Sequence, residues 1–139
     1  MATNEKTEPK DDEAGRYAYE GLDPVLHSQN RIGILTALAT HPDGLSFTEL
    51  TRLCNLTDGN LSRHLDMLAR AEDGKPALVK ISKTFQNRRP LTMVVLTGAG
   101  RKRFREYLAQ LEKVLRDAAA EEADARAAKD KARPGLTGA

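Results

Sequence analysis

Short hydrogen-bonding side chains and an arginine gather between residues 57 and 63, and a second, arginine-rich group follows between residues 83 and 89. Asparagine can pair with the edge of adenine and arginine with the edge of guanine, while hydroxyls and backbone amides suit phosphate oxygens. Both groups therefore point to contacts with double-stranded DNA. The candidate contacts are Thr57, Asp58, Gly59, Asn60, Ser62 and Arg63 in the first group and Lys83, Gln86, Asn87, Arg88 and Arg89 in the second, with Arg31 added for a flanking phosphate.

A helix is predicted to carry the first group. Leu61, Leu65 and Leu68 recur at helical spacing and form one apolar face. Thr57 can cap the start of this helix, which is expected to end near Ala71. Because the leucine face packs inward, the polar residues of the opposite face are exposed, as readout of a major groove requires.

The preceding segment predicts a second short helix. Ser46 and Glu49 fit a capping box, in which each side chain satisfies a free amide at the start of the helix. Its inward face is expected to consist of Phe47, Leu50, Leu53 and Cys54, and Asn55 begins a tight turn into the next helix. Two short helices joined by such a turn are the layout that places one helix in a DNA major groove.

The second group of candidate contacts is expected in a β-hairpin. Apolar residues near 78–81 and 93–96 indicate two strands, and a polar stretch from 83 to 90 separates them. Pro90 cannot donate to a strand ladder, so the tip of the hairpin, residues 86–90, is expected to be a loop. The adjacent cations Arg88 and Arg89 repel each other unless an anion is near, which favours a DNA contact over a solvated turn.

Several candidate residues also have simpler interpretations. Asn60 and Ser62 are ordinary residues for an exposed helix face, whereas Arg63 is favoured as a base contact because arginine to guanine is the commonest specific pair. Asp58 is unfavourable beside a phosphate and suits the positive end of a helix better. His64 lies at the edge of the apolar face, and we interpret it as a partly buried, hydrogen-bonded histidine rather than a ligand or DNA contact.

Helices are also expected on both sides of this central region. Asp23-Pro24 and Ser28 each indicate a helix start, and apolar residues then recur from Ile32 to Ala39. Leu45 is expected in a strand of one or two residues. Thr97 can cap a last helix, in which apolar residues repeat in a heptad-like pattern. The members of this seam are Phe104, Tyr107, Leu108, Leu111 and Leu115.

The seam of the last helix has two interpretations. It could pack back on the helix that contains Ile32, or it could pair with the same helix of a second chain. A long terminal helix finds little core left to cover in so small a domain, which favours a homodimer. The expected domains are a disordered acidic tail (1–20), a DNA-binding domain (21–97), a dimerisation helix (98–117) and a frayed or disordered charged tail (118–139).

Composition limits the class of protein without deciding it. A formal net charge of +2 over 139 residues does not by itself require a nucleic-acid partner, but the positive excess lies outside the acidic residues 1–20. The single cysteine, Cys54, cannot form an intramolecular disulfide. No signal peptide and no run of about 20 apolar residues is visible, so we expect a soluble cytoplasmic protein with no membrane partner.

Other classes of function have weaker support in the sequence. No nucleophile elbow, phosphate loop or convergent carboxylates indicate an enzyme. Neither a metal nor another cofactor is expected, since His27, His41 and His64 fall on different elements without ligand spacing. RNA or single-stranded DNA would call for exposed aromatic residues, of which Phe85 is the one candidate. A protein-docking module remains an alternative, although an exposed apolar patch would indicate it better than paired arginines.

The central residues resemble a known family. The run Thr57 to Leu65 is similar to that of winged-helix transcriptional regulators of the MarR/ArsR-like type, and to the small bacterial group of winged-helix DNA-binding domain proteins. The likeness extends from Asp23 to about Leu115. It is carried by Leu22-Asp23-Pro24-Val25-Leu26-His27-Ser28, Phe47-Thr48-Glu49-Leu50, Thr57-Asp58-Gly59-Asn60-Leu61-Ser62-Arg63-His64-Leu65, Arg88-Arg89-Pro90 and Leu96-Thr97-Gly98-Ala99-Gly100-Arg101.

This resemblance implies a fold that is mainly α with a small β-hairpin (α+β), namely a winged helix-turn-helix with a C-terminal dimerisation helix. It implies a homodimer that binds a short palindromic site, usually as a repressor, through the face from Thr57 to Arg63 and the basic wing. Family members that sense arsenic carry paired cysteines, whereas this chain has only Cys54. A small-molecule effector is compatible with the family, but no residue of the sequence indicates one.

Overall fold

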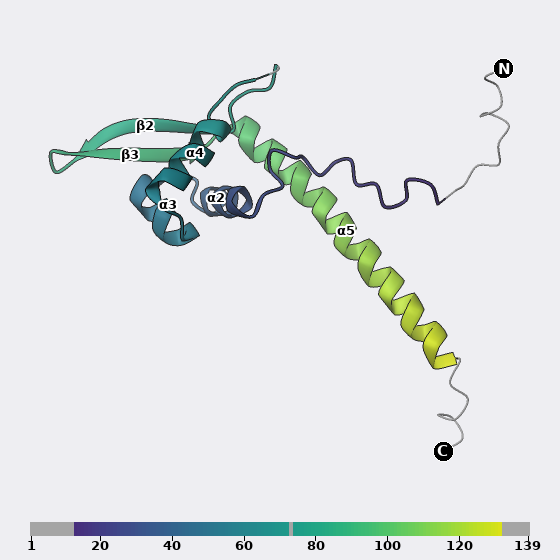
Figure 1. Ribbon diagram of the computed structural model, residues 1–139. Helices are drawn as coiled ribbons and strands as arrows, with labels where there is room; N and C mark the ends of the chain where they lie inside the picture. The colour runs from purple at the N-terminus through teal and green to yellow at the C-terminus, as the bar shows by residue number, and fades with distance from the viewer. Residues whose placement is uncertain (1–12, 73, 132–139) are drawn as a thin grey trace, which may run out of the picture.

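The computed structural model describes residues 13–72 and 74–131, and it confirms the expected fold class. A cluster of short helices and a small sheet forms one end of the molecule, and one long helix projects from it (Figure 1). The elements are α2 (Gln29–Ala39), β1 (Leu45–Ser46), α3 (Phe47–Cys54), α4 (Asp58–Leu68), β2 (Val79–Gln86), β3 (Arg89–Leu96) and α5 (Gly98–Lys131).

The sheet has three antiparallel strands in the order β1-β3-β2. The short strand β1 pairs only with the far end of β3, where Leu45 lies opposite Val94. The β2–β3 hairpin therefore continues beyond β1 as a two-stranded ribbon and extends past α3 and α4 (Figure 1). The predicted short strand at Leu45 is confirmed.

The core lies where α2, α4, the base of the hairpin and the first turns of α5 meet. Leucines dominate it, and most of its side chains are fully shielded from solvent, which supplies the main free energy of folding. The largest side chains that are fully buried are Leu26, Ile34, Leu35, Leu38, Leu50, Leu61, Leu65, Leu68, Val79, Val94 and Tyr107.

Local capping starts and stops the helices of the central motif. The Ser46 hydroxyl accepts a hydrogen bond from the Glu49 amide, and the Glu49 carboxylate accepts one from the Ser46 amide, so the predicted capping box is confirmed. Asn55 ends α3 with a left-handed backbone (φ 54°), which asparagine tolerates. The helix-turn-helix thus follows from residues close in sequence.

The hairpin tip differs from the prediction. The strands run to Gln86 and Arg89, so the loop expected over 86–90 shrinks to the two residues Asn87 and Arg88. Pro90 lies within β3, opposite Phe85. In a two-residue hairpin, the residue pair that follows the pair closing the turn makes no hydrogen bonds between the two strands. Pro90 belongs to such a pair, so its nitrogen faces away from β2. Because β1 ends short of this position, no neighbouring strand needs a donor there.

Two predicted helix boundaries also need correction. Residues near Asp23-Pro24 form a single turn, in which the Asp23 carbonyl accepts from the amides of Leu26 and His27. The helix cannot continue from there because Ser28 is extended (φ −149°) where it caps α2. At the other end of the motif, α4 stops at Leu68, before the expected Ala71.

The last helix is longer than expected. It continues as regular helix past residue 117 to Lys131, where a frayed or disordered tail was predicted. Residues 121–131 are exposed, so no core holds them. Alanine-rich composition and pairs one turn apart, such as Glu122 with Arg126, favour the helix instead. Residues 132–139 of the predicted tail lie outside the described residues.

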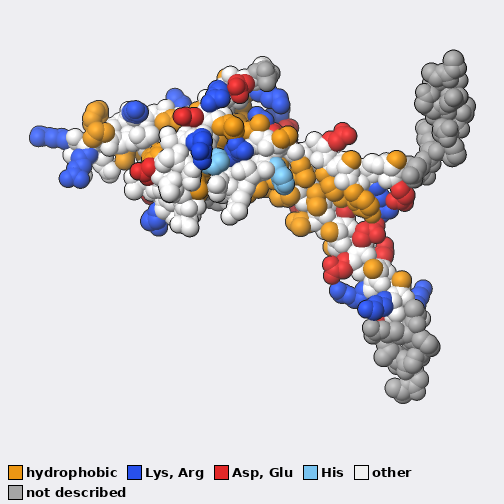
Figure 2. All heavy atoms as spheres, viewed as in Figure 1, with side chains coloured by type: hydrophobic (Ala, Val, Ile, Leu, Met, Phe, Trp, Pro, Cys, Tyr) orange, Lys and Arg blue, Asp and Glu red, His pale blue; other side chains and the backbone are white. Residues whose placement is uncertain are grey.

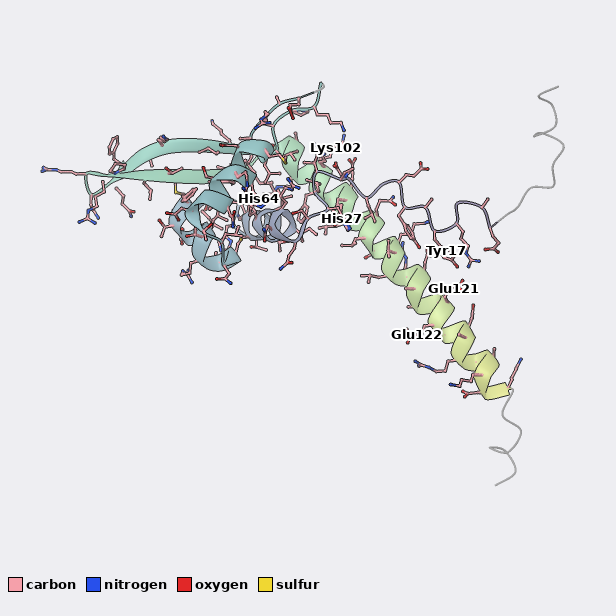
Figure 3. All side chains as sticks on the ribbon, in the orientation of Figure 1. Tyr17, His27, His64, Lys102, Glu121 and Glu122 are labelled. Atoms are coloured by element: carbon pink, nitrogen blue, oxygen red, sulfur yellow. The ribbon has the colours of Figure 1, made fainter. Side chains whose placement is uncertain are left out.

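The end of the predicted N-terminal tail is ordered against α5. Arg16 and Tyr17 both bond to the Glu121 carboxylate, at 2.7 and 2.9 Å, and the Tyr19 hydroxyl donates to Asp117 at 2.8 Å (Figure 3). Part of the segment predicted to be a disordered tail therefore contacts α5, which is long enough to offer it partners. Residues 1–12 lie outside the described part of the chain.

Candidate nucleic-acid interface

The helix α4 presents a polar face outward from a leucine anchor. Its start is capped by Thr57, whose hydroxyl accepts from the Asn60 amide at 3.1 Å. Leu61 and Leu65 are buried, whereas Ser62 and Arg63 are exposed on the other side. This is the arrangement of anchor and exposed polar groups that was predicted from the spacing of the leucines.

The two predicted base-reading side chains contact each other. An Arg63 nitrogen donates to the Asn60 Oδ1 atom at 2.6 Å. The bond restricts both side chains, and it occupies only one of the guanidinium donors. Such a pair is pre-oriented for base edges, because less side-chain freedom is lost when a partner binds.

Gly59 in the first turn of α4 is not explained by packing within the chain. A Cβ atom there would meet no atom within 4 Å. Glycine at this helical position disfavours the helix by about 1 kcal/mol relative to alanine. The open space beside Gly59, close to the exposed Thr57 and Asp58, leaves room for a partner's backbone to approach.

Ser62 lies on the flank of α4 that faces the hairpin. Together with Asp66 it borders a hollow of about 340 Å³ between α4 and the sheet, and Lys83 lies on the opposite wall. Lys83 and Gln86 are exposed on β2. These residues therefore connect the polar face of α4 with the hairpin tip.

The hairpin tip is exposed and positively charged. Asn87 and Arg88 form the turn with φ angles of 53° and 67°, in the left-handed region. Arg88 and Arg89 are both exposed, and Figure 2 shows basic side chains at the far end of the hairpin. Phe85 is 72% exposed on the same ribbon. The arrangement has the shape and charge to contact a DNA backbone beside α4.

Arg31, the predicted contact of a flanking phosphate, lies on α2 where this helix meets α4. It is partly buried between α2 and α4, where its Nη1 atom contacts the sulfur of Met67. Its neighbour Asn30 places its amide nitrogen 3.4 Å from His64 Nε2. His64 is partly buried, as predicted. The role of Asn30 escaped the sequence analysis, since no local pattern says which residues of α2 meet α4.

Comparison with known sequences assigns this geometry to a family. The profile of the winged helix DNA-binding domain matches residues 30–115. The chain belongs to the winged helix DNA-binding domain family. In this family's terms α4 is the recognition helix and the β2–β3 hairpin is the wing. The resemblance inferred from residues such as Thr57 to Leu65 is thereby confirmed.

Several solved structures have the same fold. A transcriptional regulator homologue from Pyrococcus horikoshii OT3 is 27% identical, with a TM-score of 0.62 over 73% of this chain and 95% of that one. The Mycobacterium tuberculosis regulator MosR, solved with DNA, is 21% identical (TM-score 0.54, 99% and 92% covered). The YusO protein from Bacillus subtilis is 19% identical (TM-score 0.52, 97% and 88% covered). No curated protein sequence matches the chain.

The apolar seam of α5 divides into an inner and an outer part. Phe104 and Tyr107 are buried in the core of the winged helix, so their prediction as dimer contacts needs correction. They cover the core because α5 crosses it over its first turns. Leu111 packs partly against that core, whereas Leu108 and Leu115 remain 42% and 66% exposed. The surface that is free for a partner is therefore the outer edge of the seam.

A cavity of about 440 Å³ lies beside the first turns of α5. Its walls include Lys102 and Arg103 of α5 and Lys75 of the loop before β2. Arg103 forms a two-bond pair with Asp23, at 2.5 and 2.9 Å, and this hydrogen bonding lowers the pKa of the Asp23 carboxyl. The pair ties the turn before α2 to the start of α5.

Metal and membrane sites are not found in the described part of the chain. No group of three or more histidine, cysteine or acidic residues there could hold a metal ion. No helix among residues 13–72 and 74–131 is long and apolar enough to cross a membrane. Burial raises the pKa of the Cys54 thiol, which disfavours the reactive thiolate.

Proposed function

We propose that the protein is a sequence-specific transcriptional regulator that binds double-stranded DNA as a homodimer on a palindromic site and acts as a repressor in the cytoplasm. The observation that carries this proposal is the pairing of two surfaces. The recognition helix exposes Arg63, which is joined to the half-buried Asn60 by a 2.6 Å hydrogen bond, and the wing exposes Arg88 and Arg89. One suits base edges and the other a phosphate backbone.

The homodimer is supported by the outer edge of α5. Leu108 and Leu115 lie one heptad apart and are exposed, and helices with such an edge commonly pair with a second copy. A symmetric dimer places two recognition helices about 34 Å apart, which is one turn of DNA. The site would then be palindromic because the protein is two-fold symmetric. A bound dimer of this kind represses by covering promoter DNA.

Fluorescence anisotropy with the DNA upstream of the protein's own gene tests the proposal. We expect tight binding to this duplex and weak binding to a scrambled duplex, measured at two salt concentrations. Arg63→Ala should lose about 1–3 kcal/mol of binding free energy and reduce the preference for the upstream duplex. The double variant Arg88→Ala/Arg89→Ala should weaken binding to both duplexes.

The matched control is Arg116→Ala, which removes an exposed arginine from the distal half of α5. It should bind DNA like the unmodified protein. Equal, salt-sensitive binding to both duplexes would point to a different operator. Failure to bind any duplex would contradict the proposal and favour the alternative of a protein-docking winged helix.

A further inference from the structure

At the junction between α2 and the recognition helix α4, side chains bring together more nitrogen donors than there are acceptors to pair with them. Asn30 and Arg31 enter it from α2, and His64 and Met67 enter it from α4. The Arg31 Nε atom is buried and has no hydrogen-bond partner among the described residues. A buried guanidinium N–H without an acceptor is unfavourable, so its presence calls for an explanation beyond packing.

The charges near this junction between α2 and α4 are positive. His64 lies where α4 approaches α2 (Figure 3). Burial, together with the positive charges of Arg31 on α2 and Arg63 on its own helix, lowers the pKa of His64. The neutral ring can accept at Nε2 from the Asn30 amide, 3.4 Å away. A cluster with an arginine, an amide and a titratable ring suits an anion.

The position of this junction on the recognition helix indicates which anion fits there. His64 follows Asn60 by four residues, so it borders the face that would read base edges. Groups at the edges of a helix in the major groove meet the phosphates of the flanking strands. We propose that Asn30, Arg31 and His64 together bind one backbone phosphate of DNA, and that His64 takes up a proton when the phosphate is in place. This inference rests on the proposed DNA-binding function.

The proposed proton uptake by His64 predicts the direction in which DNA affinity changes with pH. A phosphate beside the ring favours imidazolium, so the pKa of His64 is higher in the complex than in the free protein. Affinity is then greatest below the free-state pKa and falls as the pH rises through the bound-state pKa. The protonated Nε2 atom becomes a donor to the phosphate, and the Asn30 amide nitrogen remains available as a second donor. One such group changes the association constant by at most about tenfold per pH unit.

Anisotropy titrations across about pH 5.5–8 test this linkage. A phosphate contact does not depend on base sequence, so a labelled duplex of arbitrary sequence at low salt is a sufficient probe. We expect the affinity of the unmodified protein to fall with rising pH, and His64→Gln to lose that component. His41→Gln, which alters an exposed histidine in the loop after α2, is the matched control and should keep it. An unchanged pH slope in His64→Gln would overturn the inference.

NMR titration of the His64 ring gives a second readout that needs no variant to fold. We expect a higher pKa with the duplex bound than without it. In addition, Arg31→Gln should reduce the slope of log K against log salt by about 0.9, as loss of one phosphate contact does, whereas Arg116→Gln should not. Duplex binding with an unshifted His64 pKa would contradict this inference and leave the DNA-binding proposal standing. Absence of binding to any duplex would contradict both.

Discussion

Arg88 stands in the hairpin turn with a backbone conformation that glycine adopts more easily. A φ of 67° brings the Cβ atom of an L-residue close to the carbonyl that follows, which is unfavourable by about 1–2 kcal/mol. Two-residue turns of this kind favour Asn-Gly, and here asparagine is present at position 87 while arginine replaces the glycine. Among the described residues, the Arg88 side chain forms no hydrogen bond or ion pair, so the proposed DNA contact would account for an arginine at this position.

Arg88→Gly should therefore separate stability from binding. We expect the free energy of unfolding to stay the same or to rise by up to about 1 kcal/mol, because strain is relieved. DNA affinity should fall by about tenfold, or roughly 1.4 kcal/mol. Urea denaturation and anisotropy measure the two effects. Asn87→Gly changes the same turn without removing a charge and should keep the affinity. If Arg88→Gly also kept it, the wing tip would not contact DNA.

At the scale of elements, the backbone carbonyl of Leu78 holds the start of α5 against the base of the wing. The Leu78 carbonyl accepts from the amide and the hydroxyl of Thr97, both at 3.0 Å. Gly100 lies so close that a Cβ atom there would be 2.1 Å from the same oxygen. In contrast, a Cβ atom at Gly98 would meet nothing within 4 Å. The close approach lets Phe104 and Tyr107 reach the core.

Gly100→Ala should destabilise the protein, because relieving the overlap requires α5 to move away from Leu78. We expect a loss of about 1–3 kcal/mol, seen as a lower midpoint of thermal unfolding. Gly98→Ala, in the same helical turn, should be neutral or stabilising by up to about 1 kcal/mol, since alanine favours helix. Equal stabilities of the two variants would show that the first turn of α5 is not packed in this way.

At the scale of the whole molecule, α5 extends far beyond the domain that it helps to build (Figure 1). Its outer leucines and the segment around Tyr17, which bonds to Glu121, form an elongated surface away from the wing. In a monomer this surface is exposed to water. A dimer through α5 would cover it and leave both wings and both recognition helices exposed.

The double variant Leu108→Lys/Leu115→Lys should produce monomers that bind DNA weakly, because two charges would enter the proposed interface. Both positions are exposed in the single chain, so its fold should survive. Light scattering gives the mass, and anisotropy gives the affinity. Ala109→Lys/Ala120→Lys adds the same charge at exposed positions of α5 on its other side and should remain dimeric. A dimer in the first variant would exclude this interface.

The sequence by itself determined the helix-turn-helix and most of its boundaries. The capping box of Ser46 and Glu49 and the cap at Thr57 act between residues three apart, and the leucines of α4 show their spacing directly. Such features need no knowledge of distant residues. The positive charge of the wing also follows from the sequence alone, because Arg88 and Arg89 supply it wherever the two strands end.

Only the tertiary structure decided which surfaces meet. The contact of Arg31 with Met67 and the approach of Asn30 to His64 join residues more than thirty apart in the chain. The burial of Phe104 and Tyr107, predicted as contacts with a partner, depends on how α5 crosses the core. Periodicity identifies an apolar face, but the chain's own packing determines what covers it, because hydrophobic burial has no direction and any apolar surface can satisfy it.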